Sequence, residues 1–332
     1  LLSSFDWAAP LRASFDQLRS APGAAADKNQ KLNALLEASV NSWREQLMAL
    51  DGSAWGRQNS PYMIFSRAYN RLRKGKNFFD SLDEREFARI KQKTRANEIW
   101  LMDIFVIGEA MQWGTGGGSS YSIKGYRIKP ELGGEEGFKA FVARAHRAGL
   151  RVKVDFIPNH TSLDSDMINE RPEGLLHIVP PQDLTDQQIM AGVPRESGGN
   201  REPLYYLVET DHYPENGKRV AKRILVRRPI GDFGMWLDMA QIDYSRPEAR
   251  AWQIRELKRL FTELGVDSAR RDMAYDILNV RFYAHWAFTL EKELESMPTG
   301  WAQGAQAKLL SEFKQRWAAL NGAEFWEEAT EA

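Results

Sequence analysis

Two short stretches of the sequence place ionisable side chains where an apolar run ends. The first, VKVDFIPNH, carries Asp155, Asn159 and His160. The second, VDSARRDMA, carries Arg270 and Asp272. A spacing of two along an extended strand puts both side chains on one face, so Arg270 and Asp272 can point the same way. A guanidinium beside a carboxylate favours the ionised carboxylate, which predicts a charged, nucleophilic Asp272.

The segments around these stretches alternate between strand patterns and amphipathic helix patterns. Strands are predicted at PYMIFSRAY, EIWLMDIFVIG, RVKVDFIPNH and VDSARRDMA. Helices are predicted for a run that opens at Ser81, a run that ends at Gly149, a run from Pro247 to Gly265, and EFWEEATEA. This alternation is typical of a parallel α/β barrel, in which the working residues sit at the carboxyl ends of the strands. The apolar strands would be barrel wall, and their polar ends the floor of a site.

Two parts of the chain do not follow the alternation. Residues 161–245 are rich in Pro, Gly and charge, and so long a gap between strand and helix predicts an inserted, loop-rich subdomain. Residues 1–58 read as an N-terminal helical region without residues that suggest chemistry. We therefore divide the chain into 1–58, a first part of the barrel at 59–160, the insertion at 161–245, and a continuation of the barrel at 246–332.

Composition narrows the class of partner. The 332 residues include 45 basic and 45 acidic side chains, so no global field attracts nucleic acid or an anionic membrane, and a neutral partner is expected. The absence of cysteine excludes disulfides and thiolate chemistry. No apolar run approaches the roughly 20 residues that span a bilayer, and no signal-peptide pattern opens the sequence. The compartment stays open, with a slight preference for the cytoplasm.

The two polar stretches resemble conserved regions of the alpha-amylase family of glycoside hydrolases. VKVDFIPNH is similar to a first region, with an aspartate four residues before Asn-His, and GVDSARRDMA to a second, with an arginine two places before an aspartate. The segments that lead into both regions are similar too. The resemblance implies a (β/α)8 TIM barrel, here apparently incomplete at about strands 1 to 4, with an insertion like that family's domain B after strand 3.

The resemblance also implies roles for individual residues. Asp272 would be the catalytic nucleophile and Arg270 its charge partner. Asp155 and His160 would contact the sugar in the subsite being cleaved, and Tyr121 would stack under that sugar. Asn159 resembles a residue that helps to hold a structural calcium ion in many relatives. No other cofactor is implied.

The implied reaction is retaining hydrolysis of α-glucosidic bonds in starch-like or malto-oligosaccharide substrates. It needs a second carboxyl group, about 5 Å from the nucleophile, to protonate the leaving oxygen. Glu328 is a poor candidate, because Glu324, Glu327, Glu328 and Glu331 fall at helical spacing and predict a solvated helix face. We therefore expect the chain to lack its acid/base glutamate, to be a fragment, and to be poorly soluble and inactive when expressed alone, since open sheet edges promote aggregation.

Other interpretations stay open. An alpha-glucan transferase or isomerase of the same family, or a non-catalytic carbohydrate-binding relative, would carry the same motifs. Taken alone, Asp155 with His160 could order a loop, Arg270 with Asp272 could be a structural ion pair, and Tyr121 could be wall. A catalytic zinc is disfavoured because the chain has five histidines and no His-x-x-x-His pair. GTGGGSS lacks the Gly-Lys-Ser/Thr of a phosphate-binding loop and predicts a turn-rich loop.

Three residues depart from the family pattern. Arg271 stands where relatives carry an apolar residue, and its parity predicts a costly charge beneath the helix layer. Ser268 stands where glycine is usual. Lys153 has the parity of Asp155 and is expected to pair with that residue or with another acid nearby.

Overall fold

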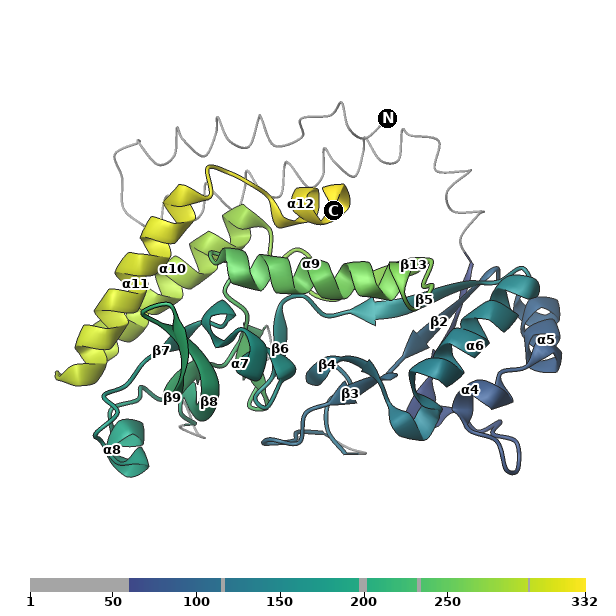
Figure 1. Ribbon diagram of the computed structural model, residues 1–332, viewed down its shortest axis with the longest axis horizontal. Coiled ribbons are helices and arrows are strands. Elements are labelled where there is room, and N and C mark those ends of the chain that lie inside the picture. Colours follow the sequence, from purple (N-terminus) through teal and green to yellow (C-terminus); the bar gives the residue numbers. More distant parts are fainter. Residues whose placement is uncertain (1–59, 115–116, 197–201, 232–233, 298) are drawn as a thin grey trace. The chain divides into compact units, whose positions relative to one another are not determined.

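The computed structural model describes residues 60–114, 117–196, 202–231, 234–297 and 299–332 (Figure 1). The chain divides into two units, 1–60 and 61–332, and the described helices and strands all lie in the second. The predicted helical region 1–58 lies in the first unit, outside the described residues.

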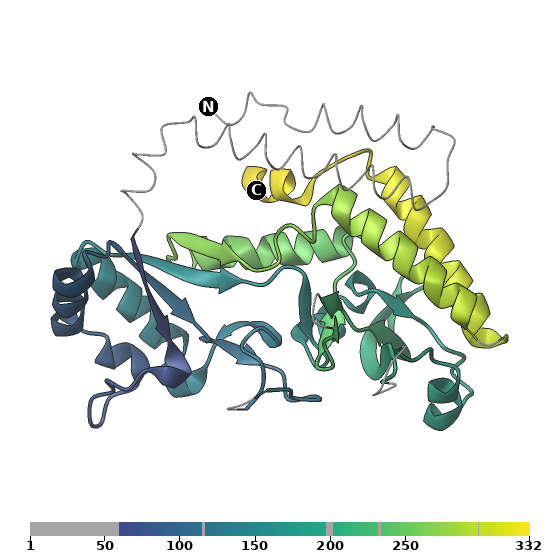
Figure 2. The ribbon, with the colours of Figure 1, turned by 180° about the vertical axis from the view of Figure 1, so that it is seen from behind.

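Four parallel strands form the central sheet. They follow one another in the order β1 (Pro61–Phe65), β2 (Glu98–Met102), β5 (Arg151–Phe156) and β13 (Ser268–Arg271), as the alternation predicted. Figure 2 shows β1 beside β2 from the reverse side. The four predicted strands are thus confirmed. The described part of the chain holds four strands of this sheet, so closure into an eight-stranded barrel remains a prediction.

Helices cover one face of this sheet. Apolar side chains on that face, such as Ile99, Val152 and Val154, are fully buried. The helices are α4 (Phe78–Ser81), α5 (Glu84–Thr94), α6 (Gly134–Arg147) and α9 (Pro247–Thr262). Phenylalanine rings from α4, α5 and α6 pack edge to face at 5.4 Å for Phe79 with Phe138 and 5.9 Å for Phe87 with Phe141.

The helix expected to open at Ser81 begins three residues later. Asp83 is its N-cap, and its carboxylate accepts hydrogen bonds from the backbone N–H groups of Arg85 and Glu86. Ser81 instead ends α4, and its hydroxyl donates to the carbonyl of Asn77 at 2.8 Å. The side chain of Asp83 satisfies the first free N–H groups of the helix, whereas the hydroxyl of Ser81 is bonded to the carbonyl of Asn77, which explains the shift.

The other face of the sheet carries charge. Glu98 of β2 is 1% exposed, forms an ion pair with Lys153 of β5, and accepts a hydrogen bond from Ser268 Oγ at 2.7 Å. Lys153 therefore pairs with a nearby acid, one of the two partners expected for it. The hydroxyl of Ser268 thus satisfies one oxygen of this buried carboxylate. A buried carboxylate oxygen without a hydrogen-bond partner would destabilise the fold.

The second predicted strand is interrupted at Asp103. This residue has φ of 63°, which ends β2 and turns the chain into β3 (Phe105–Ile107). β3 pairs antiparallel with β4 (Ile123–Ile128), a strand that the sequence patterns did not predict. A turn-rich loop with left-handed glycines at 114, 117 and 118 joins them, as expected for GTGGGSS.

Residues 160–241 hold short helices and antiparallel strands. The main sheet has the strand order β7 (His177–Ile178), β9 (Lys218–Arg227) and β8 (Tyr205–Glu215). β6 (His160–Ser162) pairs with β12 (Met239–Gln241), and β10 (Ile230–Gly231) with β11 (Gly234–Met235). The helices are α7 (Asp166–Glu170) and α8 (Asp186–Ala191), and the single 3-10 turns of the chain's described part are η1 (Ser66–Ala68), η2 (Pro130–Leu132) and η3 (Pro172–Gly174).

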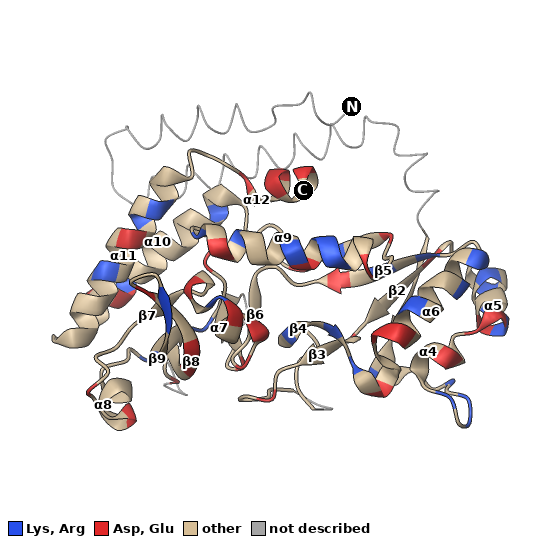
Figure 3. Ribbon diagram, in the orientation of Figure 1, with Lys and Arg blue, Asp and Glu red and all other residues tan. Residues whose placement is uncertain are grey.

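Two long helices follow the sheet and were not predicted. α10 (Asn279–Ser296) and α11 (Trp301–Ala319) pack side by side as a hairpin (Figure 1). A buried cluster joins α10 to the antiparallel sheet: Arg227 of β9 donates to Glu293 Oε1 at 2.6 Å and 2.9 Å, and Tyr205 donates to Glu293 Oε2 at 3.1 Å. Acidic and basic side chains are interspersed along α9 and α11 (Figure 3), in line with the balanced composition.

The predicted helix EFWEEATEA is α12 (Phe325–Glu331), but its glutamates are not all solvated. Glu324 is the N-cap, 9% exposed, and accepts hydrogen bonds from the backbone of Phe325 and Asn279. Burial raises its pKa to about 7. Glu328 forms an ion pair with Arg250 of α9. The prediction of a wet glutamate face is therefore wrong at Glu324, because the cap position draws it into the junction of two helices.

Arg271 points to the side of the sheet that faces α12, as its parity predicted, but it is not buried there. Its side chain is exposed, with the guanidinium 4.7 Å from the ring centre of Trp326 of α12. A cation over an indole face is stabilised without burial, so the predicted cost does not arise.

Candidate active site

Asp155, Arg270 and Asp272 meet at the carboxyl ends of the last two strands. Arg270 lies in register with Asp155 across β5 and β13. Its guanidinium Nη1 is 2.5 Å from Asp272 Oδ1 and 3.6 Å from Asp155 Oδ1. Asp272 follows β13, and its backbone N–H donates to the carbonyl of Phe156 at 2.8 Å, which extends the strand pairing to that residue. One guanidinium thus joins two carboxylates from neighbouring strands.

Tyr121 and Trp100 complete the surroundings of this triad. The Arg270 guanidinium lies 5.5 Å from the centre of the Tyr121 ring. The indole Nε1 of Trp100, on β2, donates a hydrogen bond to Asp155 Oδ1 at 3.2 Å. Both rings are half-buried. An aromatic face beside charged groups is an arrangement that suits a sugar, which has an apolar face and a rim of hydroxyls.

His160 begins β6 rather than ending β5, and its ring borders the backbone of Tyr121. It is 1% exposed and packs edge to face on Trp236 at 4.9 Å between ring centres. Its Nδ1 is 3.4 Å from Asn159 Nδ2, whereas its Nε2 has no hydrogen-bond partner within the described residues. A buried polar atom left without a partner is costly unless a ligand or water meets it.

Asn159 lies against protein groups. Its backbone carbonyl accepts a hydrogen bond from Gln241 Nε2 at 2.9 Å, and its side-chain oxygen lies 3.3 Å from the same nitrogen. Calcium prefers several oxygen ligands, carboxylates above all. Among the described residues, no group of three or more His, Cys, Asp and Glu side chains could hold a metal ion. Calcium at Asn159 therefore stays a prediction, and the proposed reaction does not depend on it.

Burial controls the ionisation of these groups. It raises the pKa of Asp155 to about 6, against the lowering effects of Arg270 and the Trp100 hydrogen bond. It also raises the pKa of Asp272 above the ordinary range, although Arg270 lowers it. Burial lowers the pKa of His160 to about 3, so this imidazole is neutral near pH 7. Arg270 lowers the pKa of Asp272, as predicted, but burial raises it by more, so the net shift is upward. The charged state of Asp272 at neutral pH stays a prediction.

The raised pKa of Asp155 predicts a pH-dependent stability. Between its ordinary value of 3.8 and about 6, Asp155 holds its proton in the folded chain and loses it on unfolding. The folded state binds more protons there, so this group's contribution to stability falls as pH rises through that window and is constant above it. Asp155→Asn, which cannot ionise, should gain stability relative to the wild type from pH 4 to pH 6. Urea unfolding of both proteins at several pH values measures this; a pH-independent difference would contradict it.

Two aromatic residues of the site were not predicted. Trp100 shares its sheet face with Asp155 by register, a relation that the strand order supplies and a single strand pattern does not. Trp236 reaches His160 from the segment between β11 and β12, some 75 residues along the chain, and the ring of Trp236 packs so closely on Gly231 that a Cβ there would lie 2.4 Å from it. Only the abundance of Trp and Tyr in the sequence hinted at them.

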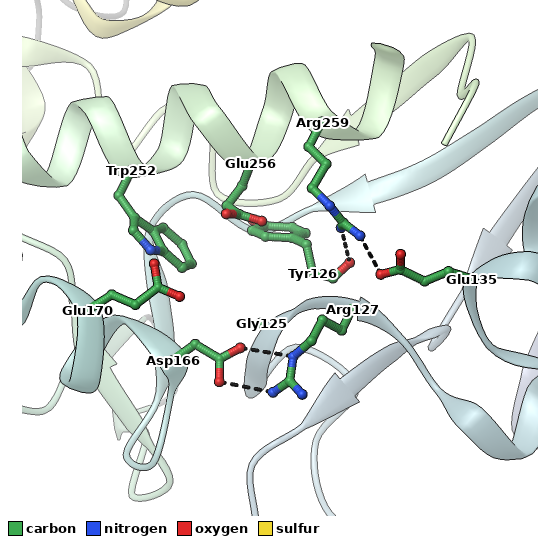
Figure 4. Close-up of a pocket in the computed structure, with 9 residues that line it drawn as sticks. All are labelled: Gly125, Tyr126, Arg127, Glu135, Asp166, Glu170, Trp252, Glu256 and Arg259. Carbon is green, nitrogen blue, oxygen red and sulfur yellow. Dashed lines mark hydrogen bonds and ion pairs between the residues drawn. The ribbon is translucent and has the colours of Figure 1, made fainter. Parts of the chain in front are cut away.

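A separate cleft has Tyr126 in its lining, and the ring of Tyr126 stacks on Phe156, the last residue of β5, at 5.3 Å between ring centres. The cleft measures about 450 Å³ and is lined by residues of β4, α6, α7 and α9, including Tyr126 and Trp252 (Figure 4). Its arginines are already paired: Arg127 with Asp166 at 2.9 Å, and Arg259 with Glu135. None of the predicted site residues lines it, so its side chains provide control substitutions. No helix of the described chain is long and apolar enough to cross a membrane.

Comparison with known proteins supports the motif analysis. Residues 92–188 match the family model described as "Alpha amylase, catalytic domain". A stretch of 43 residues is 49% identical to Maltase 1 of Drosophila virilis, which is 13% of this chain and 7% of that protein. These matches confirm the resemblance to the alpha-amylase family.

Solved structures give similar chains with partial overlap. A noncanonic maltogenic alpha-amylase AmyB from Thermotoga neapolitana is 26% identical, with a TM-score of 0.43 over 70% of this chain and 42% of that one. An alpha-amylase from Lactobacillus plantarum is 26% identical, with a TM-score of 0.45 over 71% of this chain and 42% of that one. The chain thus spans less than half the length of these relatives.

Proposed function

We propose that this chain, whose residues 92–188 match an alpha-amylase catalytic domain, supplies the nucleophile and the sugar-binding floor of a retaining enzyme that acts on α-glucosidic bonds. The observation that carries the proposal is the meeting of Asp155, Arg270 and Asp272 at one rim of the sheet, beside the ring of Tyr121. Residues more than a hundred positions apart in the chain converge there.

The geometry supports a division of labour. An oxygen of Asp272 attacks the anomeric carbon and forms a glycosyl ester, while the bond from that carbon to the leaving oxygen breaks and its electron pair stays on the oxygen. Arg270, 2.5 Å from Asp272, orients the carboxylate for attack. The carboxyl of Asp155 is placed to bind sugar hydroxyls. Nε2 of His160 is buried without a hydrogen-bond partner among the described residues, and we propose that a hydroxyl of the bound sugar meets it. Tyr121 offers its ring to an apolar sugar face.

The leaving oxygen requires a proton from a second carboxyl group. Asp155 and Asp276 are the carboxyls of the described residues that act electrostatically on this centre. Asp155 is held by Trp100 and Arg270, and Asp276 by Arg281 at 2.6 Å. Glu328 is paired with Arg250 of α9. We propose that the acid is a glutamate of a further barrel strand, which enters beside Asp272, and that a chain without it does not hydrolyse ordinary glycosides.

Malto-oligosaccharides are the proposed substrate class. The matches to a maltase and to an alpha-amylase catalytic domain point to α-linked glucose. A transferase of the same family would use the same nucleophile, and the two differ in whether water or a sugar accepts the glycosyl group. A purely carbohydrate-binding protein would not need the Arg270–Asp272 pair, so the retention of this pair favours an enzyme.

Calorimetric titration with maltotriose tests the proposal. We expect the wild-type chain to bind, and Tyr121→Ala to weaken binding by about 10-fold or more, since loss of an aromatic platform of this kind removes about 1–3 kcal/mol. Asp166→Asn, in the cleft of Figure 4, is the matched control and should bind as the wild type does. Binding that is lost with Asp166→Asn and unaffected by Tyr121→Ala would place the sugar elsewhere and refute the proposal.

A further inference from the structure

A buried carboxylate lies at the carboxyl end of β2, next to the strand ends that form the candidate site. The side chain of Asp103 is 0% exposed. Arg67 binds it with two nitrogens, Nε to Oδ2 at 2.7 Å and Nη2 to Oδ1 at 2.9 Å. Lys129 donates to Oδ1 at 2.8 Å, and the hydroxyl of Ser66 lies 3.1 Å from Oδ2. Asp103 thus holds two cations, one more than its charge requires.

Arg67 does more than neutralise Asp103. The remaining nitrogen of Arg67, Nη1, donates a hydrogen bond to the backbone carbonyl of Gly118 at 2.7 Å. Arg67 belongs to η1, directly after β1, whereas Gly118 belongs to the glycine-rich loop between β3 and β4. Because two nitrogens of the planar guanidinium are bound to Asp103, the direction of the third nitrogen, Nη1, toward that loop is fixed.

This loop carries Tyr121 three residues beyond the anchored carbonyl. Gly118 has φ of 107°, a conformation that favours glycine, and starts a short turn. In the turn, the N–H of Tyr121 donates to Ser119 Oγ at 3.2 Å. On the far side, the hydroxyl of Ser122 donates to the carbonyl of Asp238 at 2.9 Å. Tyr121 is therefore held between two anchors, at Gly118 and at Ser122.

We infer that Arg67 is a positioning residue, which fixes the glycine-rich loop to the ends of β1 and β2 and so sets the Tyr121 ring as the platform for a sugar. The inference rests on the proposed function for the identity of the ligand. Arg67 itself is not proposed to contact the sugar. It acts through Gly118, and Asp103 with Lys129 forms the rigid base on which it is held.

The pairing of Asp103 allows the positioning role to be separated from a stabilising one. In Arg67→Gln, Lys129 still neutralises the buried carboxylate, so the fold is retained while the anchor to Gly118 is lost. Arg67→Lys keeps the positive charge, but one ammonium group cannot bind both oxygens of Asp103 and also reach the carbonyl of Gly118. We expect Arg67→Lys to behave as Arg67→Gln does.

A double-mutant cycle with maltotriose tests the inference. We expect Arg67→Gln to weaken binding about 10-fold, because displacement of a binding group by about 1 Å has effects of this size or larger. The double variant with Tyr121→Ala should bind no more weakly than Tyr121→Ala alone, since the same platform is already absent. Arg73→Gln is the control, because the side chain of Arg73 is paired with Asp83 and its backbone N–H donates to Ser81 Oγ. Additive losses, or full rescue by Arg67→Lys, would overturn the inference.

Amide hydrogen exchange provides a readout that does not need the sugar. Without the Gly118 anchor, we expect the N–H groups of Tyr121 and Ser122 to exchange faster in Arg67→Gln than in Arg73→Gln, with α6 unchanged. If the wild-type chain fails to bind maltotriose but exchange accelerates as described, the proposed function fails and the positioning role stands. Unchanged exchange in Arg67→Gln would overturn the positioning role, whatever the binding result.

Discussion

Replacing Asp272 with Asn is expected to slow the reaction of this chain with a ring-fluorinated α-glucosyl fluoride by at least about 1,000-fold, because the attacking oxygen is lost. Fluoride leaves without a proton, so this reaction reports the nucleophile and is independent of the acid/base glutamate. The ring fluorine slows release of the sugar, which makes a single turnover visible. Fluoride release followed with an ion-selective electrode measures the effect.

Asp267→Asn is the matched control for this experiment. Asp267 immediately precedes β13, as Asp272 immediately follows it, and its carboxylate accepts a hydrogen bond from the Val152 N–H at 2.7 Å and contacts His146 at 2.8 Å. These contacts belong to the opposite end of the strand. We expect fluoride release by Asp267→Asn to equal that of the wild type. Undiminished release by Asp272→Asn would show that another group attacks.

Replacing Glu293 with Gln is expected to lower the free energy of unfolding by about 3–5 kcal/mol, since one partner of a buried ion pair is left without its counter-charge. Arg227 is 0% exposed and Glu293 6%, and both guanidinium contacts go to one carboxylate oxygen. Glutamine has nearly the same shape, so the loss reports the charge. Urea unfolding monitored by circular dichroism measures it.

The neighbouring pair of Lys292 and Glu295 provides the control. These residues lie on the same helix, 2.7 Å apart, with side chains 57% and 65% exposed. Lys292→Gln should change stability by no more than about 0.5 kcal/mol, as surface pairs do. A loss for Glu293→Gln as small as that of the control would mean that the Arg227 pair does not join the antiparallel sheet to α10 in the way described.

Much of the fold could be predicted because local signals and burial agree. The apolar runs at β1, β2, β5 and β13 are the strands of one sheet. Pro247 opens α9 at its first turn, and Gly149 and Gly265 follow α6 and α9 with φ of 69° and 73°. Proline has a fixed φ that suits the first turn of a helix, and glycine adopts at little cost the positive φ with which many helices end.

Other features depended on contacts between distant segments. The apolar run EIWLMDIFVIG predicts one strand. In the structure the chain turns at Asp103, whose carboxylate forms ion pairs with Arg67 and Lys129, and β3 follows the turn. The α10–α11 hairpin was not predicted, although Phe282, Trp286 and Leu290 of α10 recur at helical spacing and are buried. The signal was present in the sequence and the helices could have been predicted.

The sequence predicted on which face of each strand the site residues lie, but it did not predict the shifts in their pKa values. The spacing of Arg270 and Asp272, and the place of Asp155 at a strand end, required only the geometry of a parallel sheet. The direction in which the pKa of Asp272 shifts depends on how far the surrounding protein excludes water from its carboxyl group. No short sequence motif encodes this exclusion. The same applies to the free Nε2 of His160, whose burial comes from Trp236 and other distant residues.

The central claim is that Asp272 attacks a sugar held beside Asp155 and Tyr121. Peptide mapping by mass spectrometry, after reaction of the chain with the ring-fluorinated α-glucosyl fluoride, tests it most directly. We predict a single modified peptide with the sugar esterified to Asp272, and none in Asp272→Asn. A sugar attached to Asp155, Asp276 or a residue of the cleft in Figure 4, with Asp272 unmodified, would contradict the account.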